Sequence, residues 1–475
     1  MNEQEPSLLA RLRENGASGR IPFHMPGHKR NAARFAYLSH LSAAEDITEI
    51  DGFDNLHGAE GILADAMTRA AALWHSDRSY FLVNGSSCGI LAGIRALTRR
   101  GATVLLPRNA HKSVYHAVEL CGLRPVFLAP PWDGERGMFL SLVPEAVEEA
   151  LDAHPEARLV ILTSPTYEGV LSDVGAIARI AHAHGAALLV DEAHGAHLSL
   201  HPAFPAGAVA AGADIAVQSL HKTLPSLTQT AILHTRGTRV DHDRLAHQLA
   251  VFETSSPSYL LMASIDGCVR ALAEDPSILS DWAERLADFD AAMGTLTHLR
   301  VPFHGAERGA PLSGVFAYDP SKIYVSAVAS SMSGAAVAEF FRRRNIEPEM
   351  TARDGVLLMT GAGDTPERMS ALAAAIREAD AFCSFDPPRT RIPLPALSGE
   401  TEISPEQALE REWEFVHTSR AVGRVAAEYV WAYPPGIPIL IPGQRIPAGL
   451  LAADDDAPQL YSTRGQLPER IAVLR

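Results

Sequence analysis

Short apolar runs alternate with segments of helical periodicity between residues 61 and 270. The helical segments, such as HKSVYHAVELCG (111–122) and VGAIARIAHAHG (174–185), carry apolar residues at a spacing of three and four. Buried strands separated by helices are typical of a mostly parallel sheet with both faces covered. The pattern therefore predicts a doubly wound α/β domain. The apolar runs that we interpret as strands are YFLV (80–83), ATVLLP (102–107), RLVILTSPT (158–166), AALLVDEAHGAH (186–197) and ADIAVQSLHK (213–222).

The remaining segments predict an N-terminal arm and two smaller domains. Residues 1–60 show no long helical or strand period, so we interpret them as loops laid over the rest of the fold. The stretch 271–385 mixes helix and strand patterns, which predicts a small α+β domain. A Pro-rich break, FDPPRTRIPLPALSG (385–399), is the expected linker to a C-terminal domain at 390–475.

Composition narrows the class of protein. Hydrophobic residues make up 47% of the chain and charged residues 20%, so a large packed core is expected and wholesale disorder is excluded. The 41 Lys and Arg against 56 Asp and Glu give a net charge of −15, which argues against a partner such as nucleic acid or an anionic membrane. The sequence shows no secretory signal and no apolar run of about 18 residues, so we expect a cytoplasmic protein without a membrane span. The four cysteines form no CxxC pair and are expected to be reduced.

Polar residues of unusual kinds follow the predicted strands, at the edge of a parallel sheet where ligands bind. Ser86 and Ser87 lie between a Gly turn and a helix start, where free N–H groups favour a phosphate. Asp191 ends the most apolar strand, and a carboxylate there needs a cationic partner. Lys222 follows Ser219 and His221, and a lysine desolvated among such donors can form a Schiff base. A phosphate cradle, a buried acid and a lysine suit pyridoxal 5′-phosphate (PLP).

Two other kinds of site compete for the same residues. Gly85, Ser87 and Gly89 satisfy the G-x-S-x-G pattern of serine hydrolases, with Asp191 and a histidine as partners, although this would leave Lys222 unexplained. Three histidines, at positions 194, 197 and 201, have a spacing that metal ligands also show. No cysteine or carboxylate completes such a site, so we predict no metal.

The sequence resembles the Orn/Lys/Arg decarboxylase family of fold-type-I PLP enzymes, in its shorter bacterial branch. The resemblance extends in order from about residue 22 to residue 443. The stretches that carry it are FHMPGHKR (23–30), DITEIDGFDNLHGAEG (46–61), FLVNGSSCGI (81–90), RNAHKS (108–113), SPTYEGV (164–170), DEAHGAH (191–197), QSLHKTLPSLTQTA (218–231), SSPSYLLMASID (255–266) and YPPGIPILIPG (433–443).

The resemblance implies a role for each candidate residue. Lys222 matches the lysine that holds the cofactor aldehyde, Asp191 matches the partner of the pyridine nitrogen, and His111 matches the side chain stacked on the ring. His194 matches a position beside the ring. The residues that match phosphate donors are Ser86, Ser87, Ser219 and His221.

The family also implies a reaction and an assembly. The expected reaction is decarboxylation of arginine, lysine or ornithine to CO₂ and an amine for polyamine biosynthesis. Homodimers or higher oligomers with shared active sites are expected, so the loops of 1–60, Ser255 and Ser256 are candidates to act across an interface. Acidic residues that could bind the basic end of the substrate are Glu45, Asp46, Glu49, Asp51 and Asp54.

Some alternatives stay open at this point. An aminotransferase or aldolase of the same fold would keep Lys222 and Asp191 but would usually add an Arg for the α-carboxylate, and a non-catalytic binding protein is a third class. The chain departs from the family at Gln444, where PGE is usual, and this could alter substrate preference or a domain contact.

Overall fold

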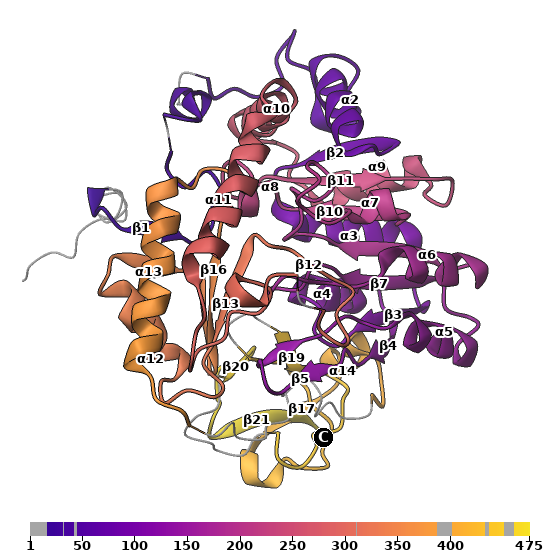
Figure 1. The fold of residues 1–475 in the computed structure, drawn as a ribbon. Coiled ribbons are helices and arrows are strands. Elements are labelled where there is room, and N and C mark those ends of the chain that lie inside the picture. The colour runs from indigo at the N-terminus through magenta and orange to yellow at the C-terminus, as the bar shows by residue number, and fades with distance from the viewer. Residues whose placement is uncertain are drawn as a thin grey trace, which may run out of the picture.

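A computed structural model describes residues 17–31, 33–41, 45–309, 311–386, 401–432, 437–450 and 460–475. The expected linker lies outside these residues from position 387 to its end, as do the first four residues of the YPPGIPILIPG stretch. The N-terminal part, the large sheet, a small sheet and a C-terminal region occupy successive parts of the chain (Figure 1).

The large domain is built on a seven-stranded sheet. Only β11 runs antiparallel to its neighbours, β10 and β2, so the sheet is mostly parallel as the sequence predicts. The strands in spatial order are β2 (Arg78–Leu82), β11 (Ala231–Thr235), β10 (Ile215–Gln218), β9 (Ala187–Asp191), β7 (Leu159–Thr163), β3 (Thr103–Pro107) and β4 (Arg124–Leu128).

Helices cover both faces of this sheet, because its strands are apolar on both sides. In β3, Val104 and Leu106 join one core cluster and Leu105 joins the other, as the alternation along a strand requires. The α/β prediction is therefore confirmed. One face carries α3 (Gly85–Leu97), α4 (Lys112–Leu120) and α9 (His242–Phe252), and the other carries α5 (Pro144–Ala153), α6 (Val174–Ala183) and α7 (Ala208–Ala211).

The region after the large sheet forms a smaller antiparallel sheet covered by helices, visible in orange in Figure 1. Its order is β13 (Lys322–Ser326), β16 (Gly355–Met359) and β15 (Met350–Ala352), with α11 (Ser277–Met293), α12 (Gly334–Arg342) and α13 (Pro366–Phe382). The N-terminal arm joins this region, because β1 (Ile21–Phe23) pairs in parallel with β14 (Ile346–Pro348). Three further helices come after the arm and before the small region in sequence. They are α2 (Ile62–Trp74), α8 (Leu220–Thr223) and α10 (Tyr259–Glu274).

Two short strand pairs and the C-terminal region complete the described fold. The pairs are β5 (Trp132–Asp133) with β6 (Met138–Phe139), and β8 (Val170–Leu171) with β12 (Ala317–Tyr318). The C-terminal strands are β17 (Trp413–His417) with β21 (Arg470–Leu474), and β18 (Val430–Ala432) between β19 (Ile437–Leu440) and β20 (Leu460–Ser462), next to α14 (Pro405–Leu409). In the described parts of the chain, no helix has the length and apolar character needed to cross a bilayer.

Candidate active site

A pocket at the carboxyl ends of β7 and β9 gathers five of the eight predicted site residues. They are Ser86, His111, Asp191, His194 and Lys222. The remaining lining comes from the loops that follow β3 and β7, from the β5–β6 hairpin and from β19 of the C-terminal region. Ligand sites in parallel sheets occupy this edge because loops with exposed polar groups begin there.

Lys222 lies in α8, the single helical turn that follows β10. Its Nζ is 2.9 Å from Nε2 of His194. Burial lowers the pKa of this amine to about 8, and Lys322 adds to that effect while the carboxylates of Asp191 and Glu349 oppose it. A lysine with a pKa near neutrality is a competent nucleophile toward an aldehyde.

Asp191 is the last residue of β9, and only 4% of its surface is exposed. Oδ1 accepts a hydrogen bond from the Ala193 N–H at 3.2 Å. Burial raises the pKa of this carboxyl, whereas Lys222 and the Ala193 bond lower it. A buried carboxylate of this kind is stabilised by a cationic N–H placed against it.

Two neutral histidines stand beside the lysine. His111 caps α4 and accepts a hydrogen bond at Nδ1 from the Ser113 N–H, and burial lowers the pKa of its ring to about 3. Burial also lowers the pKa of His194 well below its usual value. The His194 ring lies 4.4 Å from the ring of Tyr167, and its Nδ1 is buried without a hydrogen-bond partner.

The predicted phosphate donors divide into two groups. Ser86 lines the pocket from the first turn of α3, where Gly85 adopts a φ of +75° and Asn84 gives no side-chain cap. Ser87 is exposed on the same turn, and its hydroxyl bonds no histidine in the described part of the chain. Ser219 is completely buried, and its hydroxyl has no hydrogen-bond partner. His221 does not line the pocket, and its Nδ1 is 2.9 Å from the Thr230 carbonyl oxygen.

The residues present fit PLP on the chemistry of their donors. Three buried polar atoms in this part of the fold lack hydrogen-bond partners within the described ranges, namely Ser219 Oγ, His194 Nδ1 and Thr163 Oγ1. Such orphaned atoms are rare in folded proteins and are usually satisfied by a ligand or water. Together with a helix N-terminus, a buried acid and a depressed lysine pKa, they provide for the phosphate, the ring nitrogen and the aldehyde of that cofactor.

The N-terminal PGHK sequence lies directly against the lysine segment, a role that the sequence did not reveal. The Gly27 N–H donates to the His221 carbonyl at 2.8 Å. Lys29 is 1% exposed and donates to the carbonyls of His24 and Met359, each at 2.7 Å. The arm therefore joins α8 to the small sheet. This contact could not be predicted, because a run of Pro, Gly and basic residues has no helical or strand periodicity.

The pocket lining also includes residues that the sequence did not indicate. They are Phe139 of β6, Ile437 of β19, and Tyr167 and Glu168 of the turn after β7. The SPTYEGV stretch carries part of the family resemblance, but an apolar pattern does not encode the direction of each side chain in a turn.

Several candidates lie elsewhere in the single chain. The acidic residues 45, 46, 49 and 51 are exposed, and none of the acidic loop lines the pocket. Asp54 instead accepts hydrogen bonds from the N–H groups of Glu60, Gly61 and Leu63 at the start of α2, and these and the Asn55 bond hold its pKa at about 2, although burial works in the opposite direction. In the single chain, this loop therefore contributes no carboxylate to the lining of the pocket.

Two serine candidates and a histidine candidate lie outside the pocket. Ser255 and Ser256 are exposed and do not line it. His197 is completely buried and bonds Asp319 and Thr223 through its two ring nitrogens, at 2.9 and 3.2 Å. The described residues contain no cluster of three potential metal ligands.

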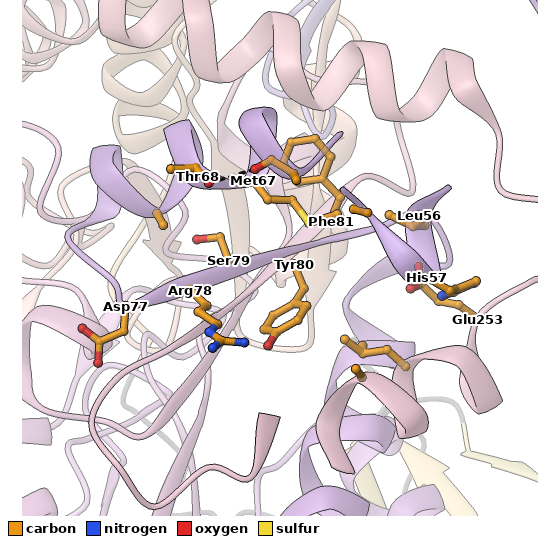
Figure 2. A pocket seen from close by; sticks show the side chains of 15 residues that line it. Leu56, His57, Met67, Thr68, Asp77, Arg78, Ser79, Tyr80, Phe81 and Glu253 are labelled. Atoms are coloured by element: carbon orange, nitrogen blue, oxygen red, sulfur yellow. Dashed lines mark hydrogen bonds between the residues drawn. The ribbon is translucent and has the colours of Figure 1, made fainter. Parts of the chain in front are cut away.

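A second, larger pocket of about 490 Å³ lies away from Lys222. Figure 2 shows it along β2, with Phe81 beside Met67 of α2, Tyr80 on the other side of the strand, and Leu56, His57 and Glu253 at one end. No predicted cofactor residue lines it.

The fold and the lysine pocket together define a fold-type-I PLP-dependent enzyme. Among solved structures, lysine decarboxylase A from Pseudomonas aeruginosa matches 99% of this chain and 80% of its own, with a TM-score of 0.74 and 20% identity. At that identity the likeness establishes the fold.

Sequence comparison gives the family. The Orn/Lys/Arg decarboxylase major domain matches residues 6–301, and the C-terminal domain of that family matches residues 394–452. The arginine decarboxylases of Halalkalibacterium halodurans and Bacillus subtilis are 34% and 32% identical, over 95% and 94% of this chain and 92% of each relative. The chain belongs to the Orn/Lys/Arg decarboxylase family and is a PLP-dependent amino-acid decarboxylase. This assignment replaces the serine-hydrolase, aminotransferase, aldolase and non-catalytic alternatives.

Proposed function

We propose that the protein decarboxylates arginine to CO₂ and agmatine. Two relatives named arginine decarboxylase match nearly the whole of this chain at more than 30% identity, which supports arginine among the three substrates of the family. The single observation that carries the chemistry is the buried Lys222 amine, with a pKa lowered to about 8, in one pocket with Asp191 and two neutral histidines.

The residues divide the work according to their positions. Ser86, Ser219 and the N–H groups at the start of α3 bind the cofactor phosphate, with Ser87 as a further donor. The Nδ1–H of His221 donates to the Thr230 carbonyl, so the neutral ring has no second N–H for the phosphate. Asp191 keeps the ring nitrogen protonated, since that carboxylate is buried and, among the described residues, accepts a hydrogen bond from the Ala193 N–H. His111 fixes the plane of the ring by stacking from the start of α4.

Lys222 transfers the proton, and His194 orients it. When bound, PLP supplies a conjugated ring that accepts the electron pair left as CO₂ departs. The neutral His194 accepts a hydrogen bond from Lys222 Nζ and so directs this nitrogen. Lys222 Nζ then returns a proton to the substrate Cα.

The test compares Lys222→Ala with Lys112→Ala, a lysine exposed at the start of α4. Pure wild type and Lys112→Ala should be yellow and release CO₂ from arginine, whereas Lys222→Ala should lose both properties. Arginine, lysine and ornithine are supplied separately, and both CO₂ and amine are quantified. A wild type that stays colourless after incubation with PLP, or that prefers lysine or ornithine, contradicts the proposal.

We also propose a homodimer with shared sites. Three large apolar side chains, Ile50, Phe53 and Val251, are about half exposed. In sequence they are close to Leu56, His57 and Glu253, which line the groove in Figure 2. Exposed apolar surface often marks a protein interface. Light scattering should give twice the chain mass of 51.0 kDa, and Val251→Glu should shift the mass toward one chain. A monomeric wild type at micromolar concentration contradicts the dimer.

We further propose that the chain divides into four parts, with boundaries at 1–60, 61–270, 271–385 and 390–475. We also propose a role in polyamine biosynthesis and a cytoplasmic location.

All four cysteines are free and buried, which supports a reducing compartment. The separate sheets of the large, small and C-terminal parts support the division. Agmatine is a precursor-type amine for polyamines, so a deletion strain should need agmatine or a polyamine for full growth.

A further inference from the structure

Glu168 lines the active-site pocket but has no part in cofactor binding or proton transfer as proposed. It occupies the turn after β7, where Thr166 N–H donates to the Val170 carbonyl at 2.9 Å and Gly169 N–H donates to the Thr166 carbonyl at 3.1 Å. Its Oε2 is buried and has no hydrogen-bond partner among the residues that the structure describes. Burial raises the pKa of this carboxyl, and only local hydrogen bonds, including one with Thr166, oppose that effect. A buried, unpaired carboxylate oxygen is costly unless a cation or donor reaches it.

The surroundings of Glu168 suit an organic cation. Phe139 from the β5–β6 hairpin, Tyr167 from the same turn and Ile437 from β19 line the pocket with it. Aromatic faces attract ammonium and guanidinium groups. In the described part of the chain, no lysine or arginine forms an ion pair with Glu168. This carboxyl is therefore available to bind a cation of the ligand.

Glu168 reaches the pocket from a different strand than Lys222. Its turn follows β7, which is separated by β9 from β10, the strand that Lys222 follows. The Asp319 N–H donates to the carbonyl of the neighbouring Gly169 at 2.8 Å, and β8 pairs with β12, so Glu168 lies on the side of the pocket that faces the small region. A basic amino acid has its second cation several bonds from the carboxylate that it loses, and it needs a partner at such a distance.

We propose that the Glu168 carboxylate binds the distal cation of the substrate, between the rings of Phe139 and Tyr167. A carboxylate can accept two parallel hydrogen bonds from a guanidinium, which favours arginine over the point charge of lysine. The proposal rests on the proposed function, since it names the residue that selects a basic amino acid. It assigns the substrate's acidic partner within one chain, in which the acidic loop does not line the pocket.

The test uses Glu168→Gln in the PLP-loaded enzyme, because glutamine keeps the size of the side chain and a hydrogen bond to Thr166. Agmatine binding is measured by calorimetry, together with KM and kcat for arginine and the absorbance of the bound cofactor. Agmatine affinity should fall about 30-fold or more, as expected for removal of one partner of a buried charge pair. The arginine KM should rise in proportion, and the cofactor absorbance should not change.

Three comparisons make the result specific. The neutral urea isostere of agmatine, N-carbamoylputrescine, should bind Glu168→Gln at least as well as wild type. Glu168→Asp, which keeps the charge, should restore part of the agmatine affinity. Glu149→Gln, a carboxyl exposed on α5, should bind agmatine as wild type does.

The outcomes separate this inference from the proposed reaction. Agmatine affinity within three-fold of wild type in Glu168→Gln overturns the inference, and so does loss of cofactor absorbance in that variant. If wild type binds agmatine through Glu168 but releases no CO₂ from arginine, the proposed function fails and the binding role of Glu168 stands.

Discussion

The ammonium of Lys322 and the carboxylate of Asp319 form an ion pair of 2.7 Å, and both side chains are completely buried. The pair belongs to the small region but reaches the active site at two points. Lys322 Nζ donates to the His194 carbonyl at 3.0 Å, and Asp319 bonds the ring of His197. Burial would raise the pKa of Asp319, but His197 and Lys322 hold it far below its usual range. The ion pair therefore fixes the loop that carries His194.

Removal of one charge from this pair should be strongly destabilising. Lys322→Met leaves the Asp319 carboxylate buried without its lysine, with hydrogen bonds from His197 and Ser321 remaining, and loss of one partner of a buried ion pair costs about 3–5 kcal/mol. Chemical denaturation monitored by tryptophan fluorescence measures the loss. The double variant Lys322→Met, Asp319→Leu should recover most of it, because neither charge remains in the core. Equal midpoints for the wild type and Lys322→Met would show that the pair contributes little.

Attachment of PLP to the apoenzyme should depend on pH through Lys222. Burial lowers the pKa of its amine to about 8, and only the neutral amine attacks the aldehyde. The rate at which absorbance appears after PLP addition should rise with pH and level off above about 8. Lys322→Met should move the midpoint upward, since a neighbouring positive charge is lost. A wild-type rate that still rises through pH 10 contradicts the burial of this amine.

The lowered pKa of Lys222 also predicts how the stability of the apoenzyme changes with pH. In the unfolded chain a lysine has a pKa of about 10.4, so between about pH 8 and 10.4 the unfolded state binds more protons than the folded apoenzyme. The contribution of Lys222 should therefore stabilise the apoenzyme progressively as pH rises through this window. Lys222→Met, which cannot titrate, should lack that part of the slope.

Gly27 cannot carry a side chain where the arm meets α8. A Cβ there would lie 2.3 Å from the Thr223 carbonyl carbon and 2.5 Å from its oxygen, and both are backbone atoms. Gly27→Ala should therefore displace the arm or α8, destabilise the fold by about 1–3 kcal/mol and weaken PLP binding. Gly134→Ala is the control, because its Cβ would meet only one atom, at 4.0 Å. Equal PLP affinity in the two variants would show that the arm does not position Lys222.

The sequence could predict what depends on local pattern. Asp191 and Lys222 end or follow apolar strands, so the edge of the sheet that they share follows from the α/β alternation. Lys322 contacts His194 across 128 positions, and its buried pair with Asp319 depends on how the small region docks. The Glu168 side chain points into the pocket because of a turn, and turn geometry is set by contacts that an apolar pattern does not contain. These residues could not be identified before the fold was known.

Gln444, the departure from the family motif, lies at a contact between the C-terminal region and the large domain. Its Oε1 accepts hydrogen bonds from Arg108 Nη2 at 3.1 Å and from the Ile441 N–H at 3.2 Å. Arg108 is 2% exposed and also donates to the Ile439 carbonyl at 2.9 Å. Gln444 does not line the pocket of Lys222, which favours the domain contact over substrate preference.

Gln444→Glu should therefore stabilise the protein without changing its choice of substrate. The carboxylate keeps both hydrogen bonds and adds a negative charge against the buried Arg108 guanidinium, and hydrogen bonds to charged groups contribute about 1.5–3 kcal/mol. The denaturation midpoint should rise, while the ratio of kcat/KM for arginine to that for lysine stays within about two-fold. Gln444→Ala, which removes both bonds, should lower the midpoint. If the substrate ratio changes with an unchanged midpoint, position 444 acts on the active site rather than on the contact.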